Sequence, residues 1–199
     1  MNKYILISLA LISILFSCTN TESNPIEAKE YWVIDQKGVG VVQIGKSISL
    51  LEQEVKVHFE TKEHKGALGF DIIDGEDVLV KVSAVQEIAE ITEIYSDKFS
   101  TIKGVRVGMT IEEIEKIYPD FAPQMDPHNG RVYFQPKDLQ SKVSRFTVYF
   151  IQQDDSPVWP FKKTADGDSF LFEPNGEIDK KSVIETMIIE AKRKDDYSH

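Results

Sequence analysis

Two short stretches of the chain share one pattern of apolar and polar positions. Residues 42–48 read Val-Gln-Ile-Gly-Lys-Ser-Ile, and residues 105–111, 63 positions later (105 − 42), read Val-Arg-Val-Gly-Met-Thr-Ile. Gly45 and Gly108 occupy the same place in the two copies, and each copy continues as an apolar series typical of a short amphipathic helix. The two series are Ile48, Leu51, Val55 and Ile111, Ile114, Tyr118. We interpret the pair as a repeated unit of a strand, a glycine turn and a helix.

A hydroxyl side chain precedes each predicted helix, where it can accept a hydrogen bond from a free amide of the first turn. In the second copy Thr110 is followed three residues later by Glu113, which completes a capping box and places negative charge at the positive end of the helix dipole. In the first copy Ser47 is followed by Leu50, so the sequence predicts a weaker cap there.

Alternating apolar and polar residues predict the strands, after a leading strand at residues 31–34. Further strands are predicted at residues 56–60, 68–73, 78–82 and 87–95, then at 131–135, 143–152, 170–172 and 183–190. For residues 87–95 a helix is the alternative, because Ile88, Ile91 and Ile94 are spaced three apart. Residues 96–103 are expected to link the halves, and residues 153–168 form a loop insertion rich in aspartate and proline. The pattern predicts an α+β fold of two tandem repeats, residues 30–102 and 103–199, each a short capped helix packed on an antiparallel sheet.

The start of the chain has the form of an export signal. Lys3 precedes a largely apolar run, residues 4–16, which ends in Leu-Phe-Ser-Cys18. This run is shorter than the about 20 residues that span a bilayer, so we expect a signal peptide, residues 1–17, that is cleaved. The ending resembles the lipobox of bacterial lipoproteins, and that resemblance implies cleavage before Cys18, a diacylglyceryl group on its sulfur and acylation of the new amino terminus. An ordinary signal with a coincidental cysteine is the alternative.

Residues 18–29 are polar, apart from a few single positions, and read as a tether between the lipid and the folded part. Removing residues 1–17 removes one of 23 basic residues and none of 33 acidic ones, which leaves a net charge of 22 − 33 = −11. Such a surface repels phosphate backbones, so nucleic acid is excluded as a partner. We expect a lipid-anchored protein of the cell envelope, at the outer membrane on its periplasmic face or at the cell surface.

Residues 40–47 satisfy the phosphate-binding pattern G-x-x-x-x-G-K-[ST]. A phosphate cradle needs a loop between the glycines, whereas Val41, Val42 and Ile44 favour a strand. The second copy has Met109 in place of Lys46. We therefore predict no nucleotide.

The chain offers no metal-binding or catalytic motif. The four histidines, at positions 58, 64, 128 and 199, lack the spacing of a zinc site, and no serine lies in a G-x-S-x-G elbow. Asp71, Asp74, Glu76 and Asp77 cluster around a predicted turn, but they lack the ligand spacing of an EF-hand loop, and Asx turns explain them without calcium. We predict no catalytic residue, no metal and no cofactor, while distant residues that converge in an envelope hydrolase stay an alternative.

Trp159 and Phe161 are the candidate partner-binding residues, because large apolar groups on a loop either fold back on the core or contact a partner. The repeated G-x-[ST]-I helix followed by a sheet, together with residues 94–101 and 104–110, resembles beta-lactamase-inhibitor-protein-like units and uncharacterised two-repeat lipoproteins of Bacteroidota-like bacteria. The resemblance implies a protein-binding scaffold without a cofactor. We expect a non-catalytic envelope lipoprotein that binds an unknown envelope protein. An inhibitor or immunity lipoprotein that neutralises a hydrolase or toxin is the alternative within this class.

Overall fold

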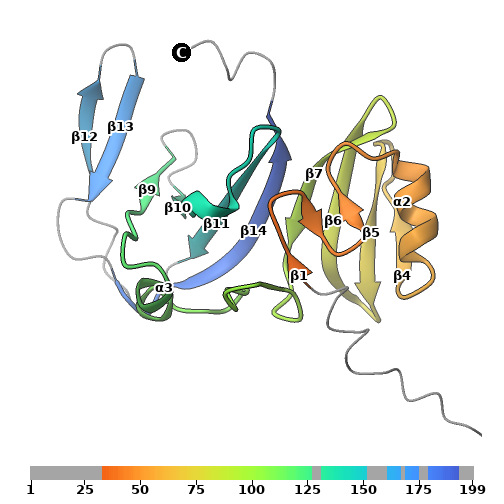
Figure 1. The fold of residues 1–199 in the computed structure, drawn as a ribbon, viewed down its shortest axis with the longest axis horizontal. Helices are drawn as coiled ribbons and strands as arrows, with labels where there is room; N and C mark the ends of the chain where they lie inside the picture. Colours follow the sequence, from red (N-terminus) through yellow and green to blue (C-terminus); the bar gives the residue numbers. More distant parts are fainter. Residues whose placement is uncertain (1–32, 127–130, 152–160, 167–168, 175–178, 193–199) are drawn as a thin grey trace, which may run out of the picture.

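The structure is a computed structural model, and it describes residues 33–126, 131–151, 161–166, 169–174 and 179–192 (Figure 1). The described chain mixes α and β structure and consists mostly of sheet, with two α-helices. The expected mixture of helix and antiparallel sheet is therefore confirmed.

An eight-stranded antiparallel sheet forms the larger layer, in the order β4-β5-β6-β7-β14-β11-β10-β9. Its strands are β4 (Glu60–Glu63), β5 (Gly69–Asp74), β6 (Asp77–Val85), β7 (Ile88–Ile94), β9 (Gln124–Met125), β10 (Val132–Phe134), β11 (Ser144–Ile151) and β14 (Val183–Ala191). The first half of the chain supplies four neighbouring strands and the second half supplies the other four. The halves meet at β7 and β14, where Met187 lies opposite Ile94 and Ile189 opposite Thr92.

A smaller sheet has the order β3-β2-β1-β8. Its strands are β1 (Val33–Ile34), β2 (Gly38–Val39), β3 (Val42–Gln43) and β8 (Ser100–Thr101). Strand β1 pairs in parallel with β8, which places the first described residues beside the segment that leads into the second half. In Figure 1 strands β1 to β3 lie between the helices and in front of the large sheet.

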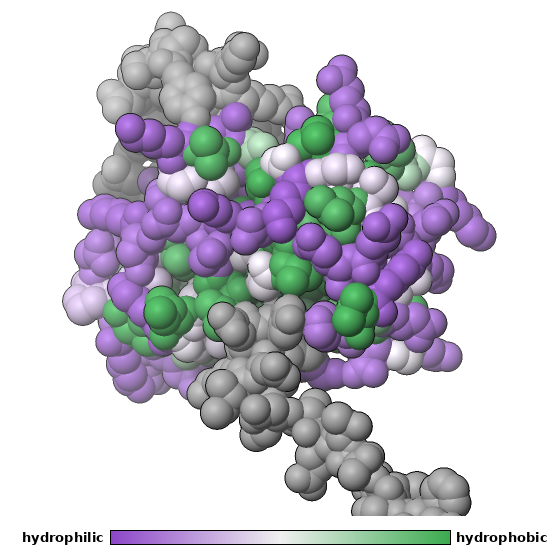
Figure 2. Space-filling model, turned by 45° about the vertical axis from the view of Figure 1, so that its right-hand side comes forward, coloured by the Kyte–Doolittle hydropathy of each residue, from purple (hydrophilic) through white to green (hydrophobic). Residues whose placement is uncertain are grey.

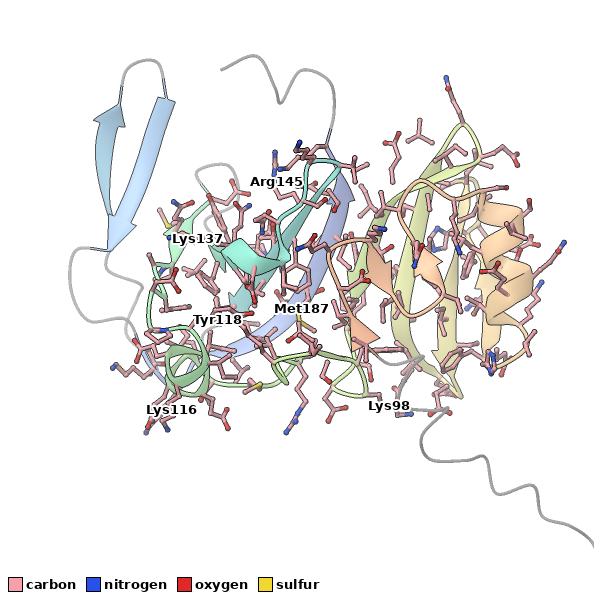
Figure 3. All side chains as sticks on the ribbon, viewed as in Figure 1. Lys98, Lys116, Tyr118, Lys137, Arg145 and Met187 are labelled. Carbon is pink, nitrogen blue, oxygen red and sulfur yellow. The ribbon has the colours of Figure 1, made fainter. Side chains whose placement is uncertain are left out.

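The two helices, α2 (Ile48–Val55) and α3 (Ile111–Ile117), bury their apolar stripes in a common core. Helix α2 buries Leu51 and Val55, and α3 buries Ile111 and Ile114. One hydrophobic cluster includes these side chains and alternate residues of both sheets, with Met187 near the middle of the molecule (Figure 3). The largest fully buried side chains include three phenylalanines, Phe70, Phe99 and Phe146.

The two glycine turns contact the sheet through the same set of backbone hydrogen bonds. Gly45 N donates to Ala89 O at 2.8 Å and Ala89 N donates to Lys46 O at 2.9 Å. Gly108 N donates to Ile184 O at 2.9 Å and Ile184 N donates to Met109 O at 2.8 Å. Each turn thus binds the first residues of the last strand in its own half, β7 or β14.

Two predicted elements of the first half differ from the structure. The strand predicted at residues 56–60 begins only at Glu60, because α2 continues to Val55 and residues 56–58 form a turn. The amides of His58 and Phe59 donate to the carbonyl of Val55, which closes that turn. The predicted link, residues 96–103, contains β8, whose parallel pairing with β1 joins segments far apart in the chain.

The loop insertion predicted at residues 153–168 is wrong over its second part. Residues 161–166 form β12 (Phe161–Asp166), which pairs with β13 (Ser169–Pro174) in a separate two-stranded sheet. The strand predicted at residues 170–172 therefore belongs to this hairpin. It does not join the large sheet, in which β14 pairs with β7 and β11.

Candidate functional site

The predicted partner-binding and lipidation residues fall largely outside the described chain. Cys18 and Trp159 lie outside the described residues, and Phe161 is the first residue of β12. The prediction placed Phe161 on a loop, and its strand position corrects that part. The residue begins a strand because residues 161–166 pair in register with residues 169–174.

The capping prediction is confirmed for Thr110. The Thr110 hydroxyl accepts a hydrogen bond from Glu113 N at 3.3 Å, and Thr110 N donates to Glu113 Oε2 at 2.8 Å. Ser47 occupies the N-cap position of α2, but its side chain makes no capping hydrogen bond, so that prediction is wrong. Its hydroxyl lies 3.0 Å from the Ser49 hydroxyl instead.

The phosphate-binding pattern does not form a cradle. The amides of Ile44, Gly45 and Ile48 donate to carbonyls of Lys37, Ala89 and Glu87. The Lys46 ammonium lies 3.5 Å from Glu54 Oε2. A cradle requires amides that point at a ligand, and these amides are engaged within the fold.

One face of the large sheet carries charged and aromatic side chains, and we call it the open face. Strand register places Lys81 of β6 between Asp71 of β5 and Glu93 of β7. Opposite charges directly across neighbouring strands stabilise such a face. Arg145 lies opposite Glu190 of β14, with Arg145 Nη1 3.1 Å from Glu190 Oε1 (Figure 3 labels Arg145).

Part of this open face gathers aromatic rings around an arginine. We call Tyr95, Arg131, Tyr133, Tyr149 and Glu185 the tyrosine patch. The Arg131 guanidinium carbon lies 4.2 Å from the Tyr149 ring centroid, and Arg131 Nη2 lies 2.6 Å from Glu185 Oε2. The rings of Tyr133 and Tyr149, which are opposite each other on β10 and β11, have centroids 6.0 Å apart. These contacts hold half-exposed rings in fixed positions.

Burial raises the pKa of Tyr133, Tyr149 and Tyr95, so all three phenols stay neutral at physiological pH. The hydrogen bond that the Tyr95 hydroxyl donates to Glu93 raises its pKa further. The Tyr133 hydroxyl donates to Gln124 Oε1 at 2.7 Å. Neutral phenols keep a donor and an apolar ring, which suits them to binding a partner and not to proton transfer at this pH.

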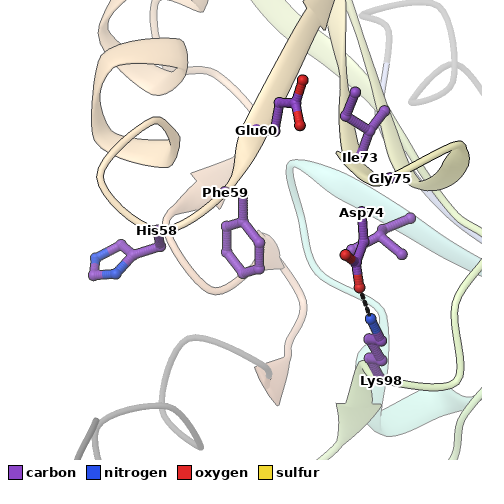
Figure 4. Close-up of a pocket in the computed structure, with 8 residues that line it drawn as sticks. His58, Phe59, Glu60, Ile73, Asp74, Gly75 and Lys98 are labelled. Carbon is purple, nitrogen blue, oxygen red and sulfur yellow. Dashed lines mark hydrogen bonds and ion pairs between the residues drawn. The ribbon is translucent and has the colours of Figure 1, made fainter. Parts of the chain in front are cut away.

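A shallow pocket of about 420 Å³ opens at one end of the sheet (Figure 4). His58 and Phe59 after α2 and Glu60 at the start of β4 line it on one side, and Asp74 and Lys98, which form an ion pair, line it on the opposite side. A second pocket of about 480 Å³ shares Leu79 and Lys98 with it. The lining of the first pocket includes both apolar and charged side chains.

The described residues hold no group of three or more His, Cys, Asp and Glu side chains that could bind a metal ion. Asp71 contacts His64 at 2.7 Å, and Asp74 pairs with Lys98, so these two carboxylates of the predicted acidic turn have separate partners. Within the described part of the chain, neither helix is long and apolar enough to cross a membrane.

The sequence indicated one part of the open face. Alternation in residues 143–152 placed Arg145, Thr147 and Tyr149 on one side of a strand and Phe146, Val148 and Phe150 on the other. Those three apolar side chains are buried, and Thr147 on the first side is buried as well. No pattern in the sequence indicated that Tyr95, Arg131 and Glu185 belong to this patch. The order of the strands in the sheet brings them together. The space-filling view in Figure 2 shows a largely hydrophilic surface with separate hydrophobic patches.

Comparisons with known proteins give a likeness to solved structures alone. No protein-family model matches the chain, and no curated protein matches it. Among solved structures, the chain is similar to the uncharacterized protein yfeY from Escherichia coli, with 14% sequence identity and a TM-score of 0.49 over 79% of this chain and 99% of that chain. A likeness of this degree assigns neither a fold family nor an activity to the chain.

Proposed function

We propose that the protein is a non-catalytic, membrane-anchored envelope lipoprotein whose open sheet face binds another protein. The tyrosine patch is the observation that carries the binding part. Tyrosine and arginine are enriched among the residues that dominate binding energy at interfaces. Rings held by a cation–π contact and by hydrogen bonds lose little conformational freedom on binding, which favours affinity.

The anchoring part of the proposal rests on the start of the chain. A basic residue, an apolar run and Leu-Phe-Ser-Cys18 lie in that order within 18 residues, and Cys18 is the single cysteine of the chain. In an exported protein a single cysteine has no disulfide partner within its own chain. Several acyl chains on one residue make an anchor stable where a single chain is marginal.

We also propose that the architecture consists of two tandem helix-and-sheet repeats. The matching hydrogen bonds of the Gly45 and Gly108 turns support this, as does the position of each turn beside the last strand of its half. The register supports it too, since Ser47 bridges Ile88 and Thr110 bridges Val183 in isolated antiparallel pairs. Because the two halves form one sheet, the open face extends over the strands of both halves.

A narrower form of this function is an inhibitor or immunity lipoprotein. Its support is the net charge of −11 that remains after removal of residues 1–17 (22 − 33), which complements a basic target and speeds association. Protection of cells from one toxin or hydrolase, abolished by deletion of the gene for this chain and restored by the wild type, would establish it.

Crosslinking in cells tests the binding surface. Partner recovery is compared for wild type, Tyr149→Ala and Lys116→Ala, the last on the exposed surface of α3, where the Lys116 side chain is 68% exposed. We expect a partner crosslinked by wild type and Lys116→Ala to be lost with Tyr149→Ala, while all three proteins show the same circular dichroism. Equal recovery with Tyr149→Ala would contradict the proposed surface.

Metabolic palmitate labelling and membrane fractionation test the anchor. Wild type should take the label and sediment with membranes, and Cys18→Ala should lose both. A wild-type protein that takes no label and stays in the soluble fraction would refute the lipoprotein assignment.

A further inference from the structure

The first described strand shows where the proposed lipid tether joins the folded part. Strand β1 begins at Val33, which lies opposite Ser100 of β8 in a parallel pair. Fifteen residue-to-residue steps along the chain separate Val33 from Cys18 (33 − 18). At no more than about 3.6 Å per residue, they keep Val33 within about 54 Å of an anchored Cys18. Val33 and Ser100 therefore mark the place where the proposed tether enters the folded part.

The two most exposed large hydrophobic side chains of the described residues lie near this place. Ile102 is 87% exposed and follows β8 directly, and Val57 is 74% exposed in the turn after α2. Phe59 and Phe99, two and three positions from them, have ring centroids 6.4 Å apart, so the two segments are neighbours. We call residues 56–59 and 96–103 the tether end.

Lysines surround these apolar side chains, and each lysine has a carboxylate partner. Lys56 lies 2.8 Å from Glu52, Lys103 lies 2.8 Å from Asp138, and Lys98 pairs with Asp74 at the rim of the pocket in Figure 4. Their charges are largely compensated, so contact with a bilayer at this end would depend on apolar insertion more than on anionic lipids. Lysine stems tolerate such a position because they extend their ammonium groups toward water.

We propose that the tether end rests on the bilayer that anchors Cys18, with Val57 and Ile102 inserted among the lipid headgroups. This rests on the proposed lipidation. Two side chains bind a bilayer too weakly to hold a free protein there, but a tether converts the contact into an intramolecular one at high effective concentration. Strands β6 and β7 then lead away from the bilayer to the turn at residues 85–88.

Fluorescence quenching by lipids tests this orientation. Lipidated full-length protein is reconstituted in zwitterionic vesicles that contain lipids with a nitroxide on the headgroup. The variants Val57→Cys, Ile102→Cys and Val85→Cys each carry a fluorophore. The chain has one cysteine, whose sulfur the lipid occupies, so labelling is specific. Val85 is the matched control. It is 52% exposed and is the last residue of β6, a strand that begins at Asp77 near the tether end.

We expect quenching about threefold stronger at positions 57 and 102 than at position 85, as for side chains that enter the headgroup layer. Equal quenching at the three positions in palmitate-labelled, vesicle-bound protein would overturn the orientation and leave the lipoprotein assignment standing. Protein that takes no palmitate and does not bind vesicles would overturn both. Circular dichroism that matches wild type confirms that each variant is folded.

Discussion

At the scale of single residues, equivalent positions of the two glycine-turn segments behave differently. Thr110 and Glu113 form a reciprocal capping box, whereas Ser47 has Leu50 at the third following position and makes no capping hydrogen bond. The position of a hydroxyl was readable from the sequence. Whether it caps was not, because the Ser47 hydroxyl lies 3.0 Å from the Ser49 hydroxyl and accepts no amide of the first turn.

Replacing the two N-cap residues tests this difference. Thr110→Ala should lower the free energy of unfolding by about 1 kcal/mol, because it leaves an amide of the first turn without its acceptor. Ser47→Ala should change it by less than about 0.5 kcal/mol, as expected for a surface substitution. Urea denaturation measures both. Equal losses in the two variants would contradict the assigned roles.

The capping box also predicts a dependence on pH. The hydrogen bond from Thr110 N lowers the pKa of Glu113 below its ordinary value of 4.5, and the hydrogen bond from the Thr110 hydroxyl adds to this. A lowered folded-state pKa means that the stabilisation is present above the unfolded value and is lost as the pH falls through the folded one. Glu113→Gln should therefore be less stable than wild type at neutral pH, with the difference fading below pH 4.5. A difference that grew in acid would refute the assignment.

Thr92 is a buried polar residue on β7, in the middle of the large sheet. Its hydroxyl has no hydrogen-bond partner among the described residues, and the residue is fully buried. Thr92→Val keeps the shape and removes the unsatisfied oxygen, so we expect a gain in stability of about 1 kcal/mol. Thr186→Val on β14 is the matched control. It should destabilise, because the Thr186 hydroxyl donates to Ile94 O at 3.0 Å. Destabilisation by Thr92→Val in thermal denaturation would show that the hydroxyl has a partner.

At the scale of elements, the glycine turns are the parts that the sequence predicted best. Gly45 and Gly108 have φ of +87° and +84°, a region that side chains with a Cβ rarely adopt. The strand predicted at residues 56–60 failed because a polar and apolar alternation of five residues fits a turn as well as a strand. Strands β12 and β13 pair with each other in a separate sheet, which the short apolar run at residues 170–172 did not indicate.

Alanine at each glycine measures the cost of this conformation. Nothing lies within 4 Å of a Cβ added at Gly45 or Gly108, so any loss of stability in the alanine variants comes from the positive φ and not from a steric clash. Gly45→Ala and Gly108→Ala should each lower the free energy of unfolding by about 1–2 kcal/mol. Asparagine at the same positions should cost less, because it tolerates positive φ. Losses that differ widely between the two sites in chemical denaturation would contradict equivalent turns.

At the scale of the whole molecule, the two halves share one sheet and one core. Strands β7 and β14 pair side by side, and the hydrophobic cluster extends from α2 to α3 without a break in the described residues. The open face also spans both halves, from Asp71 on β5 to Tyr133 on β10. Separate unfolding of the halves would expose the strand edges and the core that they share.

Met187 tests this shared core, since it is fully buried on β14 opposite Ile94 of β7. Met187→Ala should lower the free energy of unfolding by about 2–5 kcal/mol. Unfolding should remain a single transition, with coincident far- and near-ultraviolet circular dichroism, in wild type and variant. Val57→Ala is the exposed control, expected to change stability by less than about 0.5 kcal/mol. Two resolved transitions in the wild type would show independent halves.

The sequence by itself determined the local features of this protein: the glycine turns, the Thr110 capping box, the buried apolar positions of β11 and the central strands of each half. These depend on neighbours within a few residues, through backbone sterics, hydrogen bonds and side-chain periodicity. The tertiary structure alone decided that β7 pairs with β14, that β1 pairs with β8, and that Tyr95, Arg131 and Tyr149 meet on one face. Pairing between distant strands is selected by burial of the whole core against the entropy of closing long loops, which no local pattern contains.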